Sequence, residues 1–281
     1  MASLRCIREG VFGLLLLGAA PLVAECLQWQ GELQQGGFVW GRVPPGSTVT
    51  LDGEALDVLA DGTTFAGFGR DAAATAELQV EGPEPCSHTL QVAAREYAIQ
   101  RVDGVPQSTV TPPAEDLERI RREGALVRNA RAGIPQRPDL LADALAGFVW
   151  PAQGPISGVY GSQRVYNGEP RRPHFGVDVA APAGAPVTAP AAGVVTLAEP
   201  DLFFSGGTVI LDHGYRLSST FLHMSEVLVK QGDQLQPGDR IGSVGATGRA
   251  SGPHLDWRMN WRDQRIDPQL LAPPVSAMPK P

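Results

Sequence analysis

Histidine and carboxylate side chains gather in one stretch of this sequence. Of the five histidines in the 281-residue chain, four lie between positions 174 and 254. The spacing His-x-x-x-Asp joins His174 to Asp178, and the spacing His-x-Asp joins His254 to Asp256. Neutral imidazole and carboxylate are typical zinc ligands, and a catalytic zinc site leaves one position open for water. Each spacing alone occurs often by chance, whereas the two in one window predict a metal site.

Both pairs need a particular backbone to act together. On a straight strand, residues four apart are about 13 Å apart, which is too far to share a metal ion. Gly176 lies between His174 and Asp178 and allows the chain to bend, so that both side chains reach one point. Residues two apart on a strand face the same way, so we expect His254 and Asp256 to face a cleft. The alternating residues of the same strand are apolar and would face the core: Leu255, Trp257 and Met259.

The other three histidines have weaker contexts. His223 lies in an otherwise apolar strand, TFLHM, close to the two pairs along the chain. His213, in the phrase LDHG, has no assigned role, and His88 has no cluster of titratable residues around it. We expect His213 and His88 to be structural.

The elements that must position these residues form a β-rich domain over residues 148–271. Glycine and proline punctuate short runs of Val, Ile and Leu there, a pattern typical of short strands joined by turns. The expected strands include Val194-Val195, Thr208 to Leu211, Thr220 to Leu222 and Leu255 to Met259.

Residues 25–105 are also predicted to be all-β. Asp52-Gly53 and Asp61-Gly62 are hairpin turn signals between short strands, one of them expected from Thr89 to Ile99, and the spacing favours a small β-sandwich. No titratable cluster is visible there, so this domain is interpreted as a binding or spacer module.

Residues 106–147 are expected to form a helical connector. Thr111 caps a helix with Pro112 at its first position, and Gly133 is a natural stop. Leu117, Ile120 and Val127 keep helical spacing between these ends. The last segment, residues 272–281, is interpreted as a disordered tail.

The N-terminus predicts export. Residues 1–24 combine Arg5 and Arg8 with a short apolar run and a plausible cleavage site after Ala24, as in a signal peptide; the alternative is a buried helix. Cleavage would leave two cysteines, Cys26 and Cys86, and an even pair in an exported protein favours a disulfide.

Composition excludes two classes of function. The formal net charge is −7, which disfavours nucleic-acid binding because that binding depends on clustered Lys and Arg. No apolar stretch of 18 residues occurs, so no membrane-spanning helix is expected.

The motifs together resemble the lysostaphin-type zinc metallopeptidases, peptidase family M23. The resemblance covers about Phe148 to Leu271 and includes the phrases GVDVAAPAGAPVTAPAAGVV, VLVKQGDQLQPGDRIGSVGATG and ASGPHLDW. It implies that His174 and Asp178 are zinc ligands and that His223 and His254 are catalytic. Tyr160, in GVYGSQR, matches a transition-state tyrosine of some members.

One position departs from the family pattern. The family's third ligand is the second His of His-x-His, and this chain has Asp256 there. If Asp256 still binds Zn²⁺, the ligand set carries one more negative charge, and the metal is a weaker Lewis acid. Otherwise the site has lost its function and the domain is kept as a binding module.

The sequence therefore predicts an all-β protein with an N-terminal small β-sandwich, a helical connector and a C-terminal lysostaphin-type peptidase domain. The resemblance implies zinc-dependent cleavage of peptidoglycan cross-links by a periplasmic or secreted enzyme, with regulatory envelope proteins as further partners. A catalytically degenerate envelope protein that binds peptidoglycan or regulates another cell-wall hydrolase is the alternative. A sugar-phosphotransfer or lipoyl-type β domain is disfavoured by the export signal.

Overall fold

The computed structural model describes residues 26–104, 113–132 and 136–274. The predicted signal peptide lies outside the described residues, as do the predicted helix start at Thr111 and Pro112, the stop at Gly133, and residues 275–281 of the predicted tail. Within the described ranges, no helix is long and apolar enough to cross a membrane.

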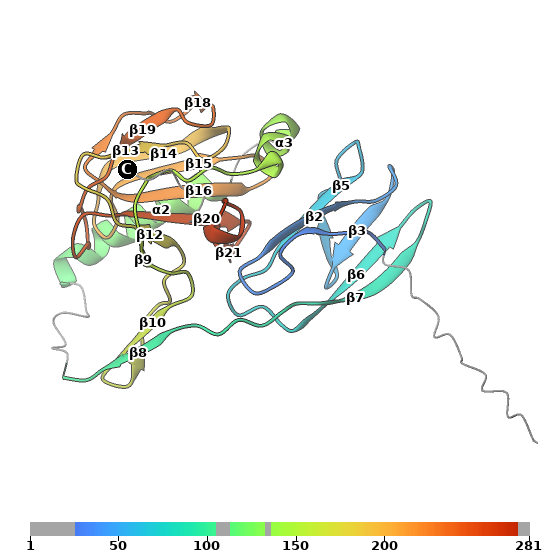
Figure 1. The fold of residues 1–281 in the computed structure, drawn as a ribbon, viewed down its shortest axis with the longest axis horizontal. Helices are drawn as coiled ribbons and strands as arrows, with labels where there is room; N and C mark the ends of the chain where they lie inside the picture. Colours follow the sequence, from blue (N-terminus) through green and yellow to red (C-terminus); the bar gives the residue numbers. More distant parts are fainter. Residues whose placement is uncertain (1–25, 105–112, 133–135, 275–281) are drawn as a thin grey trace, which may run out of the picture.

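The N-terminal part, residues 26–104, contains two small antiparallel sheets, seen on the right of Figure 1 with strand orders β1-β2-β5 and β4-β3-β6-β7. Residues alternate between exposed and buried along β6, so Ala76, Leu78 and Val80 point into the core, as expected for a half-buried strand. The strands are β1 Gln30–Gly31, β2 Phe38–Arg42, β3 Thr48–Leu51, β4 Glu54–Leu56, β5 Thr63–Gly67, β6 Thr75–Glu81 and β7 Cys86–Gln91.

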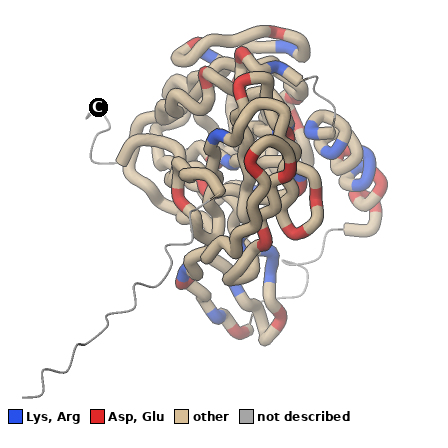
Figure 2. The backbone as a smooth tube through the Cα atoms, turned by 90° about the vertical axis from the view of Figure 1, so that its right-hand side faces the viewer, with Lys and Arg blue, Asp and Glu red and all other residues tan. Residues whose placement is uncertain are grey.

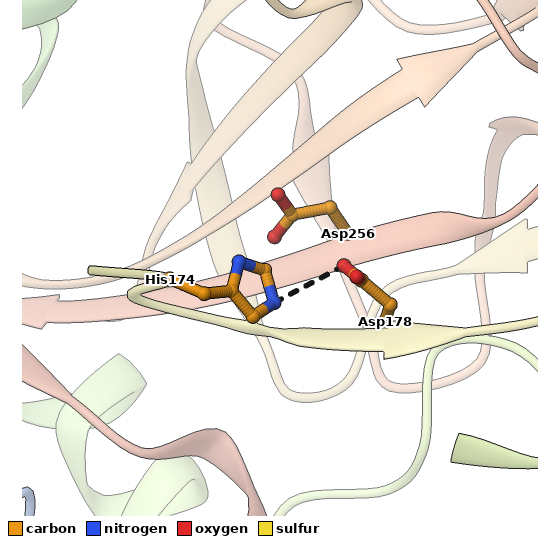
Figure 3. A group of neighbouring side chains, drawn as sticks. All are labelled: His174, Asp178 and Asp256. Atoms are coloured by element: carbon orange, nitrogen blue, oxygen red, sulfur yellow. Dashed lines mark ion pairs between the residues drawn. The ribbon is translucent and has the colours of Figure 1, made fainter. Parts of the chain in front are cut away.

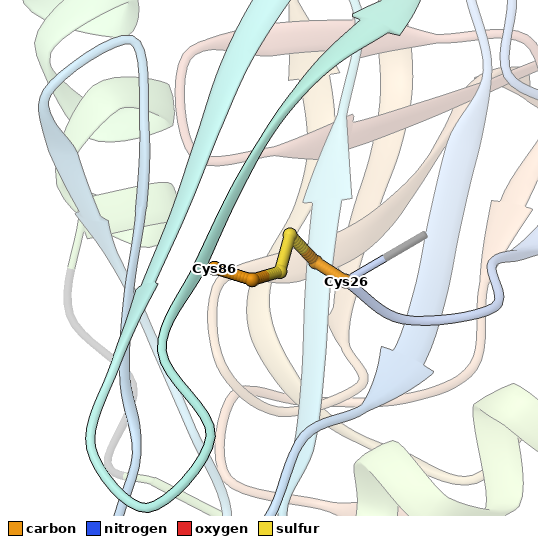
Figure 4. The surroundings of a disulfide bond; sticks show 2 residues. All are labelled: Cys26 and Cys86. Carbon is orange, nitrogen blue, oxygen red and sulfur yellow. A yellow bond between two sulfur atoms is a disulfide. The ribbon is translucent and has the colours of Figure 1, made fainter. Parts of the chain in front are cut away.

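A disulfide joins the start of the described chain to β7. Cys26 and Cys86 are bonded, with their Cα atoms 5.7 Å apart (Figure 4). The predicted pairing is confirmed. The strand predicted from Thr89 to Ile99 is wrong in length, because β7 ends at Gln91 and the N–H of Val92 donates to Ala74 O outside the ladder.

The C-terminal part is built on one large sheet with the strand order β18-β14-β15-β16-β20-β12-β9, and β21 pairs with β20. A small sheet with the order β13-β19-β17 lies beside it (Figure 1). The strands are β9 Ile156–Gly158, β12 Val177–Val179, β13 Pro186–Thr188, β14 Gly193–Leu202, β15 Gly206–Asp212, β16 Leu217–Met224, β17 Glu226–Val227, β18 Gln234–Leu235, β19 Arg240–Ser243, β20 Leu255–Trp261 and β21 Gln264–Ile266, followed by the 3-10 helix η2 Pro268–Leu270. The predicted all-β fold class is confirmed.

The two parts share one hydrophobic core. Trp261 at the end of β20 packs against Phe38 and Phe65, with ring centroids 6.3 and 6.2 Å away. A second link is a small sheet in which β8 Ile99–Val102 pairs in parallel with β10 Gln163–Tyr166, itself paired with β11 Glu169–Pro170.

The connector is helical, as predicted. It contains the 3-10 helix η1 Ala114–Asp116 and two α-helices, α2 Leu117–Ala132 and α3 Pro138–Ala146. Helix α3 was not predicted from the sequence, although Pro138 at its first turn and the buried Leu140, Leu141 and Ala144 are helix signals. Acidic and basic side chains both occur along α2 (Figure 2).

Helix α2 lies on one particular face of the large sheet. Its Val127 and Ala130 pack against a small cluster that contains Ile210 of β15. Ile210 lies opposite Thr220 of β16, and Thr220 lies opposite Arg258 of β20. Side chains directly opposite each other on neighbouring strands project to the same face. Helix α2 therefore covers part of the face that carries Arg258.

Candidate metal centre

Three ligand-type side chains converge where β12 and β20 lie side by side. Asp178 of β12 is directly opposite Asp256 of β20, so both carboxylates project to one face of the sheet. The chain bends at Gly176, just before β12, and returns His174 towards them. One ligand atom from each of the three residues lies within 4.8 Å of the others, and Figure 3 shows the side chains pointing to a common centre.

The atoms at this centre fit a divalent cation. His174 Nε2 and Asp178 Oδ1 lie 3.2 Å apart, and both are buried without a hydrogen-bond partner. Such orphaned polar atoms are rare because leaving one unsatisfied costs about 1–3 kcal/mol. A Cβ on Gly158 would come within 2.1 Å of Asp178 Oδ2, and one on Gly176 within 2.5 Å of Asp256 Oδ1. The two glycines thus leave the room that the carboxylates occupy.

Backbone hydrogen bonds hold His174 in place. Its N–H donates to Ser162 O, and its carbonyl oxygen accepts from the Gly161 N–H, both at 2.8 Å. The backbone of His174 is therefore held by Gly161 and Ser162, which belong neither to β12 nor to β20. This support explains how a residue four positions from Asp178 can reach the same centre.

Asp256 has a partner that was not predicted from the sequence. Arg258, two residues along β20, donates from Nε to both carboxylate oxygens at 3.0 Å and from Nη2 to Oδ2 at 2.5 Å. Burial raises the pKa of Asp256, but Arg258 outweighs burial and the net pKa lies below the ordinary value. A carboxylate offers about four lone-pair sites, so Asp256 can accept these bonds and still bind a metal.

His223 and His254 lie next to each other beside the cluster. Their ring centroids are 4.9 Å apart, and His254 Nε2 lies 3.8 Å from Asp178 Oδ1. Nδ1 of His223 is 2.8 Å from Thr247 O, and Nδ1 of His254 is 2.8 Å from Gly252 O. Because a carbonyl can only accept, each Nδ1 carries the proton, and each neutral ring presents an unprotonated Nε2.

His223 reaches this position through an unusual backbone conformation. Strand alternation would direct His223 to the core side with Phe221, opposite to Leu222, which faces Asp256 in register. His223 instead adopts φ +65°, uncommon for a residue with a side chain and typical of functional sites. Its N–H donates to Ser205 O. The broken alternation brings the ring beside His254.

The remaining candidates lie elsewhere. His213 is fully buried, with its ring nitrogens on Ala192 O and Ser219 Oγ, which confirms the structural assignment. His88 lies on β7 in the N-terminal part. The Tyr160 hydroxyl donates to Arg265 O at 2.6 Å, and the ring is buried. That bond gives Tyr160 a structural role and does not support the transition-state role implied by the resemblance.

Four arginines near the metal centre were not predicted from the sequence. Arg131, Arg172, Arg258 and Arg265 come from four segments and influence one another electrostatically. Only Arg258 carried a sequence signal, since its spacing from Asp256 puts both on one face of a strand. The other three are brought there by α2, by the segment before β12 and by β21.

The arrangement agrees with comparisons to known proteins. The model of peptidase family M23 matches residues 172–268, a range that includes the five residues predicted for the site. The crystal structure of a Pseudomonas aeruginosa protein assigned to the same family is 30% identical, with a TM-score of 0.64, and the match covers 85% of this chain and 95% of that one. The chain belongs to peptidase family M23.

Among characterised M23 relatives, the peptidoglycan DD-endopeptidase ShyA of Vibrio cholerae is 37% identical over 109 residues, which are 38% of this chain and 25% of ShyA. The DD-carboxypeptidase/endopeptidase Mpg of Neisseria meningitidis is 37% identical over 104 residues, 37% of this chain and 24% of Mpg. The matched part of this chain thus spans about a quarter of the length of these relatives.

Proposed function

We propose that this M23 protein is a zinc-dependent endopeptidase that cleaves the peptide cross-links of peptidoglycan. The observation that carries the proposal is the convergence of His174, Asp178 and Asp256 beside His223 and His254. The substrate class is supported by relatives that are named for peptidoglycan cleavage.

His174, Asp178 and Asp256 would hold the zinc ion, which supplies a Lewis acid for the scissile carbonyl and the attacking water. The rings of His223 and His254 lie side by side, and each has an unprotonated Nε2, so either can accept the proton of the water. The protonated ring can then donate a hydrogen bond to the developing oxyanion or return the proton to the leaving amine. Burial lowers the pKa of His223, which keeps this imidazole neutral and able to accept a proton near pH 7.

The proposed location of the protein is based on the predicted export signal. We propose that the mature protein starts after Ala24 and acts in the periplasm or outside the cell, where a disulfide persists. We further propose residues 148–271 as the catalytic domain, residues 25–105 as a separate binding or spacer domain, and envelope proteins as regulatory partners.

One observation favours a second candidate. The three hydrogen bonds from Arg258 already satisfy much of the Asp256 carboxylate without a metal. If the guanidinium displaced the metal, the protein would be a catalytically degenerate envelope protein that binds peptidoglycan or regulates another hydrolase.

Digestion of purified peptidoglycan separates the two candidates. The mature protein should release uncross-linked muropeptides, identified by mass spectrometry, and a chelator should stop the release until zinc is restored. His254→Ala should lose the activity and keep the metal, whereas His174→Ala should lose both. Binding of wild-type protein to peptidoglycan without any release, in the presence of zinc, would favour the degenerate candidate.

A further inference from the structure

A group of four cationic side chains extends from the metal centre along the same face of the sheet. We name it the arginine cluster: Arg131 of α2, Arg172 before β12, Arg258 of β20 and Arg265 of β21. Asp256, Arg258 and Asn260 alternate along β20 and therefore share one face. The cluster begins at Asp256, to which Arg258 is bound.

Specific hydrogen bonds bring two of the other arginines, Arg131 and Arg265, to this face. Nη2 of Arg131 donates to Thr220 Oγ1 at 3.0 Å, and Thr220 lies directly opposite Arg258 in register. Nη1 of Arg265 donates to Asn260 Oδ1 at 2.8 Å.

Arg172 and Arg265 also meet at one ring. Their guanidinium carbons lie 5.6 and 5.9 Å from the centroid of Phe175, the residue after His174. The ring therefore ties both cations to the segment that carries the first ligand.

Three of the four arginines of this cluster have no ion-paired carboxylate among the described residues. Arg258 pairs with Asp256, whereas Arg131, Arg172 and Arg265 form no ion pair with a carboxylate of the described residues. Nε of Arg131 is buried without a hydrogen-bond partner. Such a concentration of cations is unexpected in a chain of net charge −7.

Neighbouring arginines lower the pKa values of Arg131 and Arg265. Burial and then Arg265, Arg258 and Arg172 lower the pKa of Arg131 to about 9. Burial and then Arg172 and Arg258 lower the pKa of Arg265 to about 10. Arg131 and Arg265 both remain cationic at pH 7, and an anion between the arginines would relieve their repulsion.

We propose that the arginine cluster binds a free carboxylate of the peptide substrate next to the scissile bond. The planar guanidinium group matches a carboxylate with two parallel hydrogen bonds, and a peptide offers carboxylates at its terminus and on acidic residues. The cluster adjoins the metal centre, so a carboxylate held there would belong to a residue close to the bond that is cut. The inference rests on the proposed peptidase function and adds selectivity for anionic peptides.

Two cross-linked peptides test the proposal, identical except that one carries a free carboxylate beside the scissile bond and the other a primary amide. Binding is measured by calorimetry with zinc-loaded His254→Ala protein, which should not cleave them. We expect at least about tenfold tighter binding of the carboxylate peptide, because a hydrogen bond to a charged group is stronger than one between neutral groups. When Arg172→Gln or Arg265→Gln is combined with His254→Ala, the ratio of the two peptide affinities should fall towards one. Arg265→Lys in the same background should keep part of the preference for the carboxylate peptide.

Arg42→Gln is the matched control, because Arg42 is an exposed arginine of the N-terminal part that pairs with Asp61. It should keep the full preference, and thermal unfolding checks that each variant is folded. Equal binding of the two peptides by the His254→Ala protein with no further substitution would overturn the proposal. A carboxylate preference in binding, with no cleavage of either peptide by the wild-type enzyme, would keep this binding site and reject the endopeptidase function.

Discussion

Asp256 and Arg258 are best understood as one unit. Replacing the family's histidine ligand by aspartate adds a negative charge at the metal, and the Arg258 guanidinium, hydrogen-bonded to both carboxylate oxygens, adds a positive charge. The pair therefore leaves the net charge around the centre the same as that of the family's His/His/Asp set. This weakens the sequence-based argument that Asp256 makes the metal a poorer Lewis acid.

The pairing with Arg258 determines the expected effect of a histidine at position 256. Asp256→His would leave Arg258 without its carboxylate beside a divalent cation, so we expect weaker zinc binding than in the wild type. The double variant Asp256→His/Arg258→Gln removes the unpaired charge and should bind zinc at least about tenfold more tightly than the single variant, a difference of about 1.4 kcal/mol. Competition with a chromophoric chelator measures both affinities. Equal affinities of the single and double variants would show that Arg258 has no influence on the centre.

Gly176 supplies space as well as the bend. A Cβ at this position would lie 2.5 Å from Asp256 Oδ1 and 2.6 Å from Arg258 Cγ. Gly176→Ala should therefore displace the pair and weaken zinc binding about tenfold or more, measured by the same competition. Gly252→Ala is the control, because a Cβ there meets nothing within 4 Å. A similar loss in both variants would mean that the crowding at Asp256 is not the cause.

Asp212 predicts a pH dependence of stability away from the centre. Burial raises its pKa from 3.8 to about 7. As the pH rises from about 4 to 7, the unfolded chain loses this proton before the folded protein does, so the free energy of unfolding falls. Asp212→Asn should remove this loss and keep the acceptor for the Gly214 N–H.

The gain from Asp212→Asn should be close to zero at pH 4 and at most about 4 kcal/mol at pH 8. Urea unfolding of both proteins at the two pH values measures it. A gain that does not change with pH would rule out titration of Asp212 as the cause.

The strand pairing of β12, β16 and β20 accounts for most of the site. Asp256 of β20 lies opposite Asp178 of β12 on one side and opposite Leu222 of β16 on the other. This register brings the three strands together at one centre. The His-x-Asp spacing and the bend at Gly176 were predictable, because strand alternation and glycine freedom are local properties. The position of His223 was not, since its φ of +65° reverses the direction that alternation predicts.

Helix α2 is attached to the site face by few contacts. None of its residues is fully buried, and Val127 and Ala130 supply its apolar contact with β14 and β15. Its other attachments are polar: Glu123 accepts from the Phe203 N–H, Arg119 pairs with Asp201, and Arg131 donates to Thr220 Oγ1. Such a helix should open more readily than the sheet that it covers.

Val127→Asp tests this attachment. The half-buried apolar contact of α2 would receive a charge, so α2 should be cleaved several times faster in limited proteolysis while the melting temperature of the sheet domain shifts by only about 2 °C. Asn129→Asp introduces the same charge at an exposed position of the helix and should leave the cleavage rate unchanged. Equal rates for the two variants and the wild type would show that the apolar contact does not hold α2.

The whole molecule is more unified than its sequence indicates. The all-β class, the connector helix and the Cys26–Cys86 bond follow from local patterns and cysteine count. The packing of Trp261 against Phe38 and Phe65 could not be predicted, because it joins residues about 200 positions apart. The arginine cluster was missed for the same reason, since its members come from four segments. The division into domains at residues 105 and 147 stays a prediction.

The central claim is that Asp256, although paired with Arg258, still serves as a metal ligand in an active peptidase. The most direct measurement is the zinc content of the purified mature protein by elemental mass spectrometry, taken on the same sample that is assayed for muropeptide release. We predict about one zinc ion per chain with cross-link cleavage in the wild type, and loss of both in Asp256→Ala. Wild-type protein that stays zinc-free in excess zinc and releases nothing would contradict the account.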